Sequence, residues 1–158
     1  MTQFGHTLDK VLSGEKTATS RIVKPGDAAH SLTTGEIFAV SRHCQTGLDR
    51  LIYALGKDYA IQPGRGQKAV GRFLVTGIER YDVRTITHER ARLEGFSGVF
   101  AFLDVWTSMH DPTFHARWAG ELRYGGDKVV NMLDALANRQ AAKYDAWWLT
   151  FELVSEAK

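Results

Sequence analysis

The segment 147–154 constrains the fold more than any other part of the chain. It reads Trp-Trp-Leu-Thr-Phe-Glu-Leu-Val, so an extended strand here carries large apolar side chains on both faces. Such a strand has to be covered on both sides, and we therefore expect it in the middle of a sheet or barrel. With 158 residues, of which 44% are apolar, the chain is long enough for one domain with its own core.

Hydrophobic spacing elsewhere predicts short strands and peripheral helices. The predicted strands cover residues 16–23, 37–41 and 68–78, and the predicted helices cover 4–12, 87–94, 97–110 and 127–143. Leu48, Leu51, Ile52 and Leu55 have the spacing of a further helix, while Pro63, Gly64 and Gly66 predict a loop over 61–66. The His110-Asp111-Pro112 run is expected to end a helix. We therefore predict a single α+β domain over residues 1–158.

Composition and local sequence exclude several classes of protein. The single cysteine, Cys44, rules out a disulfide framework and a cysteine-rich zinc module. No apolar run approaches the roughly 18–20 residues that span a bilayer, and the first residues lack the pattern of a signal peptide. We expect a soluble, cytoplasmic protein without a membrane partner and without a cofactor.

Positive charge is concentrated in the middle of the chain. Residues 41–92 hold ten basic and five acidic side chains, whereas residues 93–158 hold six basic and nine acidic ones. This distribution suits a surface that faces RNA, with Arg42, Arg65, Lys68 and Arg72 as candidate nucleic-acid contacts. The alternative is a solvated, arginine-rich face, and the run 64–68 (Gly-Arg-Gly-Gln-Lys) is either a phosphate contact or a flexible turn.

Two short segments carry the residues best suited to chemistry. In the first, Lys16 and Arg21 can hold an anion, while the hydroxyls of Thr17, Thr19 and Ser20 can bond a polar heterocycle. The alternative is an exposed edge strand whose hydroxyls are solvated.

The second segment covers residues 86–96 and contains two candidate acids, Glu89 and Glu94. Glu94 precedes Gly95 at an expected helix end, where a carboxylate can face inward. Alternatively it pairs with Arg90, four residues earlier on the same helix.

Taken together and in this order, the two segments resemble the ASCH family of the PUA-like group of small β-barrels. The matching residues are Gly14, Lys16, Thr17, Thr19 and Arg21, then Ile86-Thr87 and Glu94-Gly95-Phe96. The resemblance implies an α+β fold, a PUA-like mixed β-barrel with peripheral helices. Compared with small members of the family, this chain has extra material around residues 42–66 and 104–145.

The resemblance also implies a cleft for a nucleotide or a modified base. Similar proteins include bacterial amidohydrolases that remove the acetyl group from N4-acetylcytidine, and others that bind or cleave RNA. Carried over residue by residue, the catalytic groups fall on Lys16, Thr19 and Glu94, with Arg21, Thr17 and Ser20 as substrate contacts. Family likeness leaves open whether the chain is this hydrolase, an RNA-binding module or a ribonuclease, and its oligomeric state is also open.

The amidohydrolase chemistry is coherent on physical grounds. A threonine hydroxyl needs a base, and Lys16 can be that base only if burial or a nearby cation such as Arg21 lowers its pKa. Residues three apart in a strand point to opposite faces, so we expect Lys16 in a turn before the strand that holds Thr19. If the segment is instead fully extended, Lys16 and Ser20 form the better pair.

A metal site is not expected. His110 and His115 flank Asp111, but Pro112 interrupts any helix between them and no third ligand is close in sequence.

Overall fold

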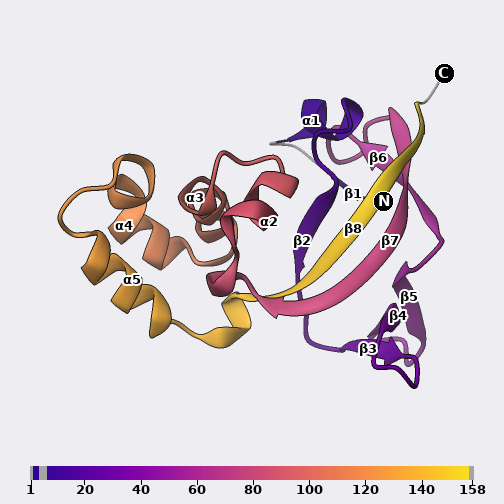
Figure 1. Ribbon diagram of the computed structural model, residues 1–158. Helices are drawn as coiled ribbons and strands as arrows, with labels where there is room; N and C mark the ends of the chain where they lie inside the picture. The colour runs from indigo at the N-terminus through magenta and orange to yellow at the C-terminus, as the bar shows by residue number, and fades with distance from the viewer. Residues whose placement is uncertain (1, 4–6, 157–158) are drawn as a thin grey trace.

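Strand β8 (Asp145–Glu156) lies inside a five-stranded sheet, as its two apolar faces require. The computed structural model describes residues 2–3 and 7–156 (Figure 1). The strand order is β1–β6–β7–β8–β2, and every pair is antiparallel except β1 with β6. The other members are β1 (Thr2–Gln3), β2 (Ala18–Ile22), β6 (Asp58–Gln62) and β7 (Gly71–Asp82).

Three further strands form a second, antiparallel sheet. They are β3 (Asp27–Ser31), β4 (Ile37–His43) and β5 (Asp49–Ala54), in the order β3–β4–β5. Val40 of β4 packs into the same apolar cluster as Phe73, Val75 and Trp147 of the larger sheet. The two sheets therefore share one core.

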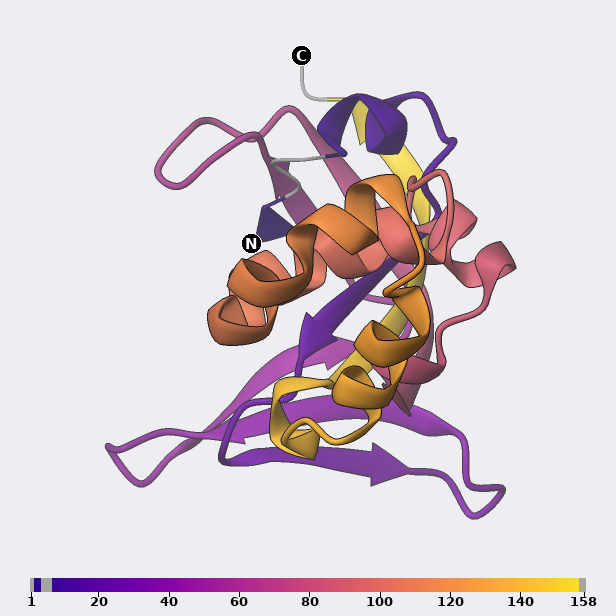
Figure 2. The same ribbon diagram turned by 90° about the vertical axis from the view of Figure 1, so that its left-hand side faces the viewer.

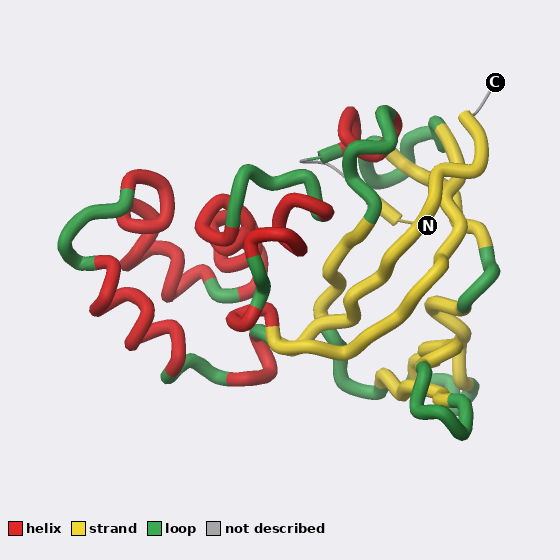
Figure 3. The backbone as a smooth tube through the Cα atoms, viewed as in Figure 1, coloured by secondary structure: helices red, strands yellow, loops and turns green. Residues whose placement is uncertain are grey.

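Helices α2 to α5 gather on one side of the sheets, and α1 lies apart from them near the start of β2 (Figures 1 and 3). The helices are α1 (Leu8–Leu12), α2 (His88–Leu93), α3 (Val99–His110), α4 (Pro112–Tyr124) and α5 (Val129–Ala137), with 3-10 turns at Val83–Thr85 and Ala141–Lys143. Helices α2 to α5 enclose a second apolar cluster around Leu103, Trp106 and Met132. Figure 2 shows α3, α4 and α5 in front of the sheets. None of the helices described has the length and apolarity to cross a membrane.

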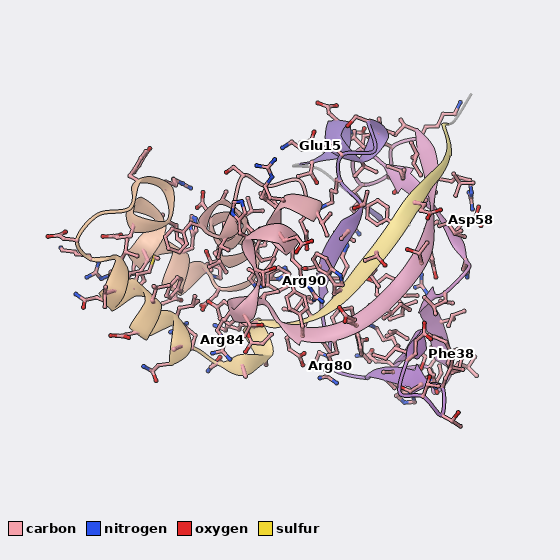
Figure 4. All side chains as sticks on the ribbon, viewed as in Figure 1. Glu15, Phe38, Asp58, Arg80, Arg84 and Arg90 are labelled. Carbon is pink, nitrogen blue, oxygen red and sulfur yellow. The ribbon has the colours of Figure 1, made fainter. Side chains whose placement is uncertain are left out.

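Polar contacts join the helical part to the segments that follow β7 and precede β8. Asp111, between α3 and α4, has a fully buried side chain that accepts hydrogen bonds from Arg139 and from the Tyr144 hydroxyl. Arg84 donates to three carbonyls at the C-terminal end of α5 (Figure 4). Ala146 and Trp147, adjacent on β8, belong to the helical cluster and the sheet cluster respectively, so β8 links both cores.

The α+β class is confirmed, and so is the central place of the C-terminal strand. The predicted helix around Leu48 to Leu55 is wrong, because this segment is β5 and pairs with β4. Its apolar residues do not form one buried stripe, since Leu48 and Leu51 are exposed. The loop predicted over 61–66 begins later in the structure than predicted, because residues 61 and 62 belong to β6.

Strand β3 was not predicted, and the other differences concern the helices. Helix α4 was not predicted, because Pro112 was interpreted as the end of a helix, whereas it occupies the first turn of a new one. Gly98 rather than Ser97 precedes α3 as its N-cap. Phe4, at the start of the first predicted helix, lies outside the described residues.

Candidate functional site

Lys16 lies in the short segment between α1 and β2, just after a turn. Helix α1 ends at Leu12, and Gly14 adopts a φ of +78°, a left-handed conformation that glycine tolerates best. The Lys16 N–H then donates to the Lys10 carbonyl at 2.8 Å, and β2 begins two residues later. The turn therefore precedes Lys16, and from Thr17 on the chain is already paired with β8, since the Phe151 N–H donates to the Thr17 carbonyl at 2.9 Å. A bend between Lys16 and Thr19, which their pairing requires, stays a prediction.

Glu94 is placed by a second glycine turn. Thr87 accepts a hydrogen bond from the Arg90 N–H and so caps the start of α2, and Glu94 caps its end. Gly95 adopts a φ of +89°, which turns the chain away from the helix axis. The Thr17 N–H donates to the Leu93 carbonyl at 3.0 Å, so the end of α2 is tied to the segment that carries Lys16.

The two turns bring Lys16 and Glu94 into direct contact. Lys16 Nζ donates to the Glu94 carbonyl oxygen at 2.8 Å and to Glu94 Oε2 at 3.2 Å, and each side chain is 4% exposed. The alternative partner of Glu94, Arg90, instead pairs with Glu79 and lies over the Trp148 ring. Glu94 therefore faces inward, toward Lys16.

Burial changes the pKa of Lys16. Loss of solvent lowers the pKa of Lys16, the carboxylate of Glu94 opposes that effect, and the guanidinium of Arg21 lowers the pKa further. Burial also lowers the pKa of Arg21. A lysine with a lowered pKa can act as a base, which an exposed lysine near neutral pH cannot.

A cavity of about 990 Å³ opens over the pair. It is lined by Lys16, Thr19, Ser20, Arg21 and Glu94. Arg42, which is half-buried, and Arg72, which is exposed, also line it. Of the candidate acids and contacts singled out in the sequence, Thr17, Arg65, Lys68 and Glu89 do not line it. Thr17 contributes backbone bonds to Leu93 and Phe151, and Arg65 and Lys68 lie on the exposed loop between β6 and β7.

The cavity has aromatic walls as well as polar groups. Tyr53, Tyr59, Phe96, Phe102 and Trp106 all line it, and Lys16 Nζ lies 5.9 Å from the centre of the Phe96 ring. Flat apolar walls around a few buried polar groups suit a heteroaromatic ring. Glu94 Oε1 is buried without a hydrogen-bond partner among the described residues, so it is an acceptor available to a ligand N–H.

The charge of the lining is strongly positive. Seven cationic side chains line the cavity, namely Lys16, Arg21, Lys24, Arg42, Arg50, Lys57 and Arg72, against the two carboxylates of Asp58 and Glu94. Lys24, Arg50 and Lys57 were missed in the sequence, since they come from three separate segments and match no motif. Only the general excess of basic residues after position 41 pointed toward Arg50 and Lys57.

His110 is a further lining residue that the sequence did not place here. Its ring lies against Trp106, with centroids 4.3 Å apart, and burial together with Arg21 and Lys24 lowers its pKa. His115 bonds instead to Asp104 at 2.7 Å. Within the part of the chain that the structure describes, no group of three potential ligands is arranged to hold a metal ion.

Comparison with known proteins gives a likeness of fold. No family model matches the sequence, and no curated protein matches it. A protein from Enterococcus faecalis V583, assigned to the DUF984 family, is similar in structure with a TM-score of 0.51 and 18% identity, covering 98% of this chain and 73% of its own. An ASCH domain from Lactobacillus crispatus JV V101 has a TM-score of 0.48 and 14% identity, with coverages of 94% and 70%.

The chain shares its fold with the Enterococcus faecalis protein. At these identities the likeness concerns the fold alone. The ASCH-like fold was expected from the two motif segments, and in the structure residues from both segments line one cavity.

Proposed function

We propose that the chain is an amidohydrolase that removes an acyl group from the N4 amide of a modified cytosine nucleoside. The observation that carries the proposal is the buried Lys16–Glu94 pair, which lines the same aromatic-walled cavity as Thr19. A buried lysine whose pKa is lowered, next to a hydroxyl-bearing strand, supplies a base and a nucleophile for acyl transfer.

In the proposed reaction, neutral Lys16 takes the proton of the Thr19 hydroxyl as Oγ1 attacks the acyl carbonyl carbon. The C–N4 bond breaks, and N4 leaves as the amine with the proton returned by Lys16. Water then hydrolyses the acyl-threonine, which releases the carboxylic acid and restores the hydroxyl. Glu94 orients Lys16 and accepts from the N4–H through Oε1, and Arg21 stabilises the oxyanion.

Hydrolysis of N4-acetylcytidine tests this proposal. The variants Lys16→Met, Thr19→Val and Glu94→Gln keep the size of each side chain, and each is expected to lower kcat by about a hundredfold or more. Lys128→Met removes an exposed lysine outside the cavity and serves as the control. Thermal unfolding of each variant shows whether it folds. If the native protein releases no cytidine, or if folded variants keep their rate, the proposal is wrong.

A second function, RNA binding or RNA cleavage, is favoured by the seven cations of the lining. Phosphate contacts release counterions, so binding of a single-stranded RNA would weaken steeply with salt. Hydrolysis of a neutral nucleoside has no such dependence. Titration of an RNA decamer at several KCl concentrations, with product analysis for cleavage, distinguishes these functions.

A further inference from the structure

The mouth of the cavity carries more positive charge than its own carboxylates neutralise. We call Lys24, Arg42, Arg50, Lys57 and Arg72 the cationic rim. All five line the cavity, and four of them are exposed, Arg42 being half-buried. Lys16 and Glu94, by contrast, are buried at its base. The cavity therefore has a nearly dry floor and a hydrated, positive mouth.

Two members of the cationic rim are already paired. Arg42 donates to Asp27 from Nε at 2.6 Å and from Nη2 at 3.1 Å, and Arg72 donates to Asp58 at 2.6 Å. Among residues 7–154, whose side chains the structure describes, Lys24, Arg50 and Lys57 have no carboxylate within 4.0 Å. Lys57 lies over the Tyr59 ring, which leaves its charge in place.

Strand pairing holds two of the cations opposite each other. Arg42 of β4 and Arg50 of β5 are direct partners in the antiparallel register. Like charges directly opposite on neighbouring strands are unfavourable. Asp27 compensates Arg42 from the β3 side, where it is the register partner of that residue, and nothing comparable compensates Arg50. An anion bound at the mouth removes this repulsion.

We infer that the ligand of this cavity carries a phosphate group, and that Lys24, Arg50 and Lys57 bind it at the cationic rim. The identity of the base rests on the proposed function. A neutral nucleoside gives these cations no partner, whereas a phosphate accepts several charge-assisted hydrogen bonds at once. The aromatic walls then hold the base above Lys16 and Glu94, with the sugar between base and mouth.

Calorimetric titration tests the inference without relying on catalysis. The probes are cytidine, cytidine 5′-monophosphate and a cytidine decaribonucleotide, each at 50 and 300 mM KCl. We expect the monophosphate to bind about tenfold more tightly than cytidine at low salt, and the difference to shrink at high salt. Equal affinity of cytidine and its monophosphate overturns the inference, and so does a failure of the native protein to bind either.

Variants identify the rim as the source of the preference. Arg50→Gln and Lys57→Gln are each expected to weaken binding of the monophosphate several-fold and to leave that of cytidine unchanged. Arg92→Gln removes an exposed arginine outside the cavity and is the matched control. A monophosphate-to-cytidine ratio that survives the Arg50→Gln/Lys57→Gln double variant overturns the assignment.

The probes also separate this inference from the proposed reaction. Tight binding of the monophosphate without hydrolysis of its N4-acetyl form supports the phosphate site and contradicts the amidohydrolase. Hydrolysis of N4-acetylcytidine and of its 5′-monophosphate with equal kcat/KM supports the reaction and contradicts the phosphate site. Stronger binding of the decaribonucleotide than of the monophosphate, lost in the rim variants, supports the phosphate site and identifies a polymer as its source.

Discussion

Lys16 Nζ donates to both the backbone carbonyl and the carboxylate of Glu94, at 2.8 and 3.2 Å, in a place where each side chain is 4% exposed. Removing two such charges from water costs free energy, and their mutual attraction offsets that cost only while both partners are present. The pair also joins α2 to the segment before β2, so it connects the helical part of the molecule to the sheet.

Loss of one partner is therefore expected to cost more than loss of both. Glu94→Met leaves a buried lysine without its carboxylate and should lower the free energy of unfolding by about 3 kcal/mol at pH 7. The double variant Lys16→Met/Glu94→Met removes both charges and should recover most of that loss. Urea unfolding of the native protein, Lys16→Met, Glu94→Met and the double variant measures the coupling. Additive costs of the two single variants would show that the pair does not act as a unit.

The lowered pKa of Lys16 predicts a pH dependence of stability. Between that lowered pKa and the ordinary value of 10.5, the unfolded chain binds a proton that the folded chain does not. The free energy of unfolding should therefore rise with pH in this window, relative to Lys16→Met, by at most about 1.4 kcal/mol per pH unit. Urea unfolding from pH 7 to 10 tests this, and parallel curves for the two proteins contradict it.

Arg21 contributes to the same shift, because its positive charge disfavours protonated Lys16. Arg21→Gln should raise the pKa of Lys16, and the rising limb of the pH–rate profile should move to higher pH. A ¹³C titration of the Lys16 Cε signal, assigned by its absence in Lys16→Met, reports the pKa independently of turnover. Lys128→Gln, which is distant from the cavity lining, should leave that titration unchanged.

Asp111 is expected to support the helical part of the molecule. Burial alone would raise the pKa of this carboxyl, but hydrogen bonds from Arg139 and Tyr144 lower it below the ordinary value of 3.8. The stability that the ionised form provides is present above pH 3.8 and is lost as the pH falls toward the lowered pKa. Asp111→Asn should lower the free energy of unfolding by about 3 kcal/mol at pH 7 and flatten the acid dependence.

An exposed hydrogen-bonded aspartate gives the control for Asp111. Asp49 bonds to His43 at the surface, so Asp49→Asn should change the free energy of unfolding by less than about 0.5 kcal/mol. Urea unfolding between pH 2.5 and 7 compares the two variants with the native protein. Equal effects of Asp111→Asn and Asp49→Asn would mean that the buried network does not stabilise the fold.

Each of the two segments that form the site could be predicted from the sequence, because each is local. Lys16 and Thr19 share one short segment, and Glu94 follows a helix that Thr87 starts and Gly95 ends. The contact between the segments was expected only through family likeness. The rim was not predictable, because Lys24, Arg50 and Lys57 come from three separate segments that line one cavity only in the fold, and β5 itself was predicted to be a helix.

The same reasoning explains why α4 was missed while β8 was predicted. A strand with two apolar faces is stable only where both faces are covered, so the sequence of β8 predicts an interior place in a sheet. Pro112 admits two opposite roles, since proline ends one helix and fits the first turn of the next. Asp111 and Pro112 form the junction between α3 and α4, and only the tertiary contacts of Asp111 make that junction evident.

The two glycine turns beside the site provide the last prediction. Gly14 and Gly95 both have left-handed φ angles, so alanine at either position is strained by about 1–2 kcal/mol. They differ in space, because a Cβ at Gly14 meets no atom within 4 Å, whereas a Cβ at Gly95 lies 3.1 Å from Lys10 Cδ and 3.4 Å from Thr7 Cγ2. Lys10 also donates to the Gly95 carbonyl at 2.6 Å, so the crowding displaces the residue next to Glu94.

Gly95→Ala should therefore destabilise the fold more than Gly14→Ala and should also lower kcat. Gly14→Ala, with open space around the new methyl group, should lose stability with little effect on kcat. Thermal unfolding and N4-acetylcytidine hydrolysis of both variants at pH 8 give the comparison. Equal losses of kcat at equal stability would show that the position of Glu94 does not depend on the Gly95 turn.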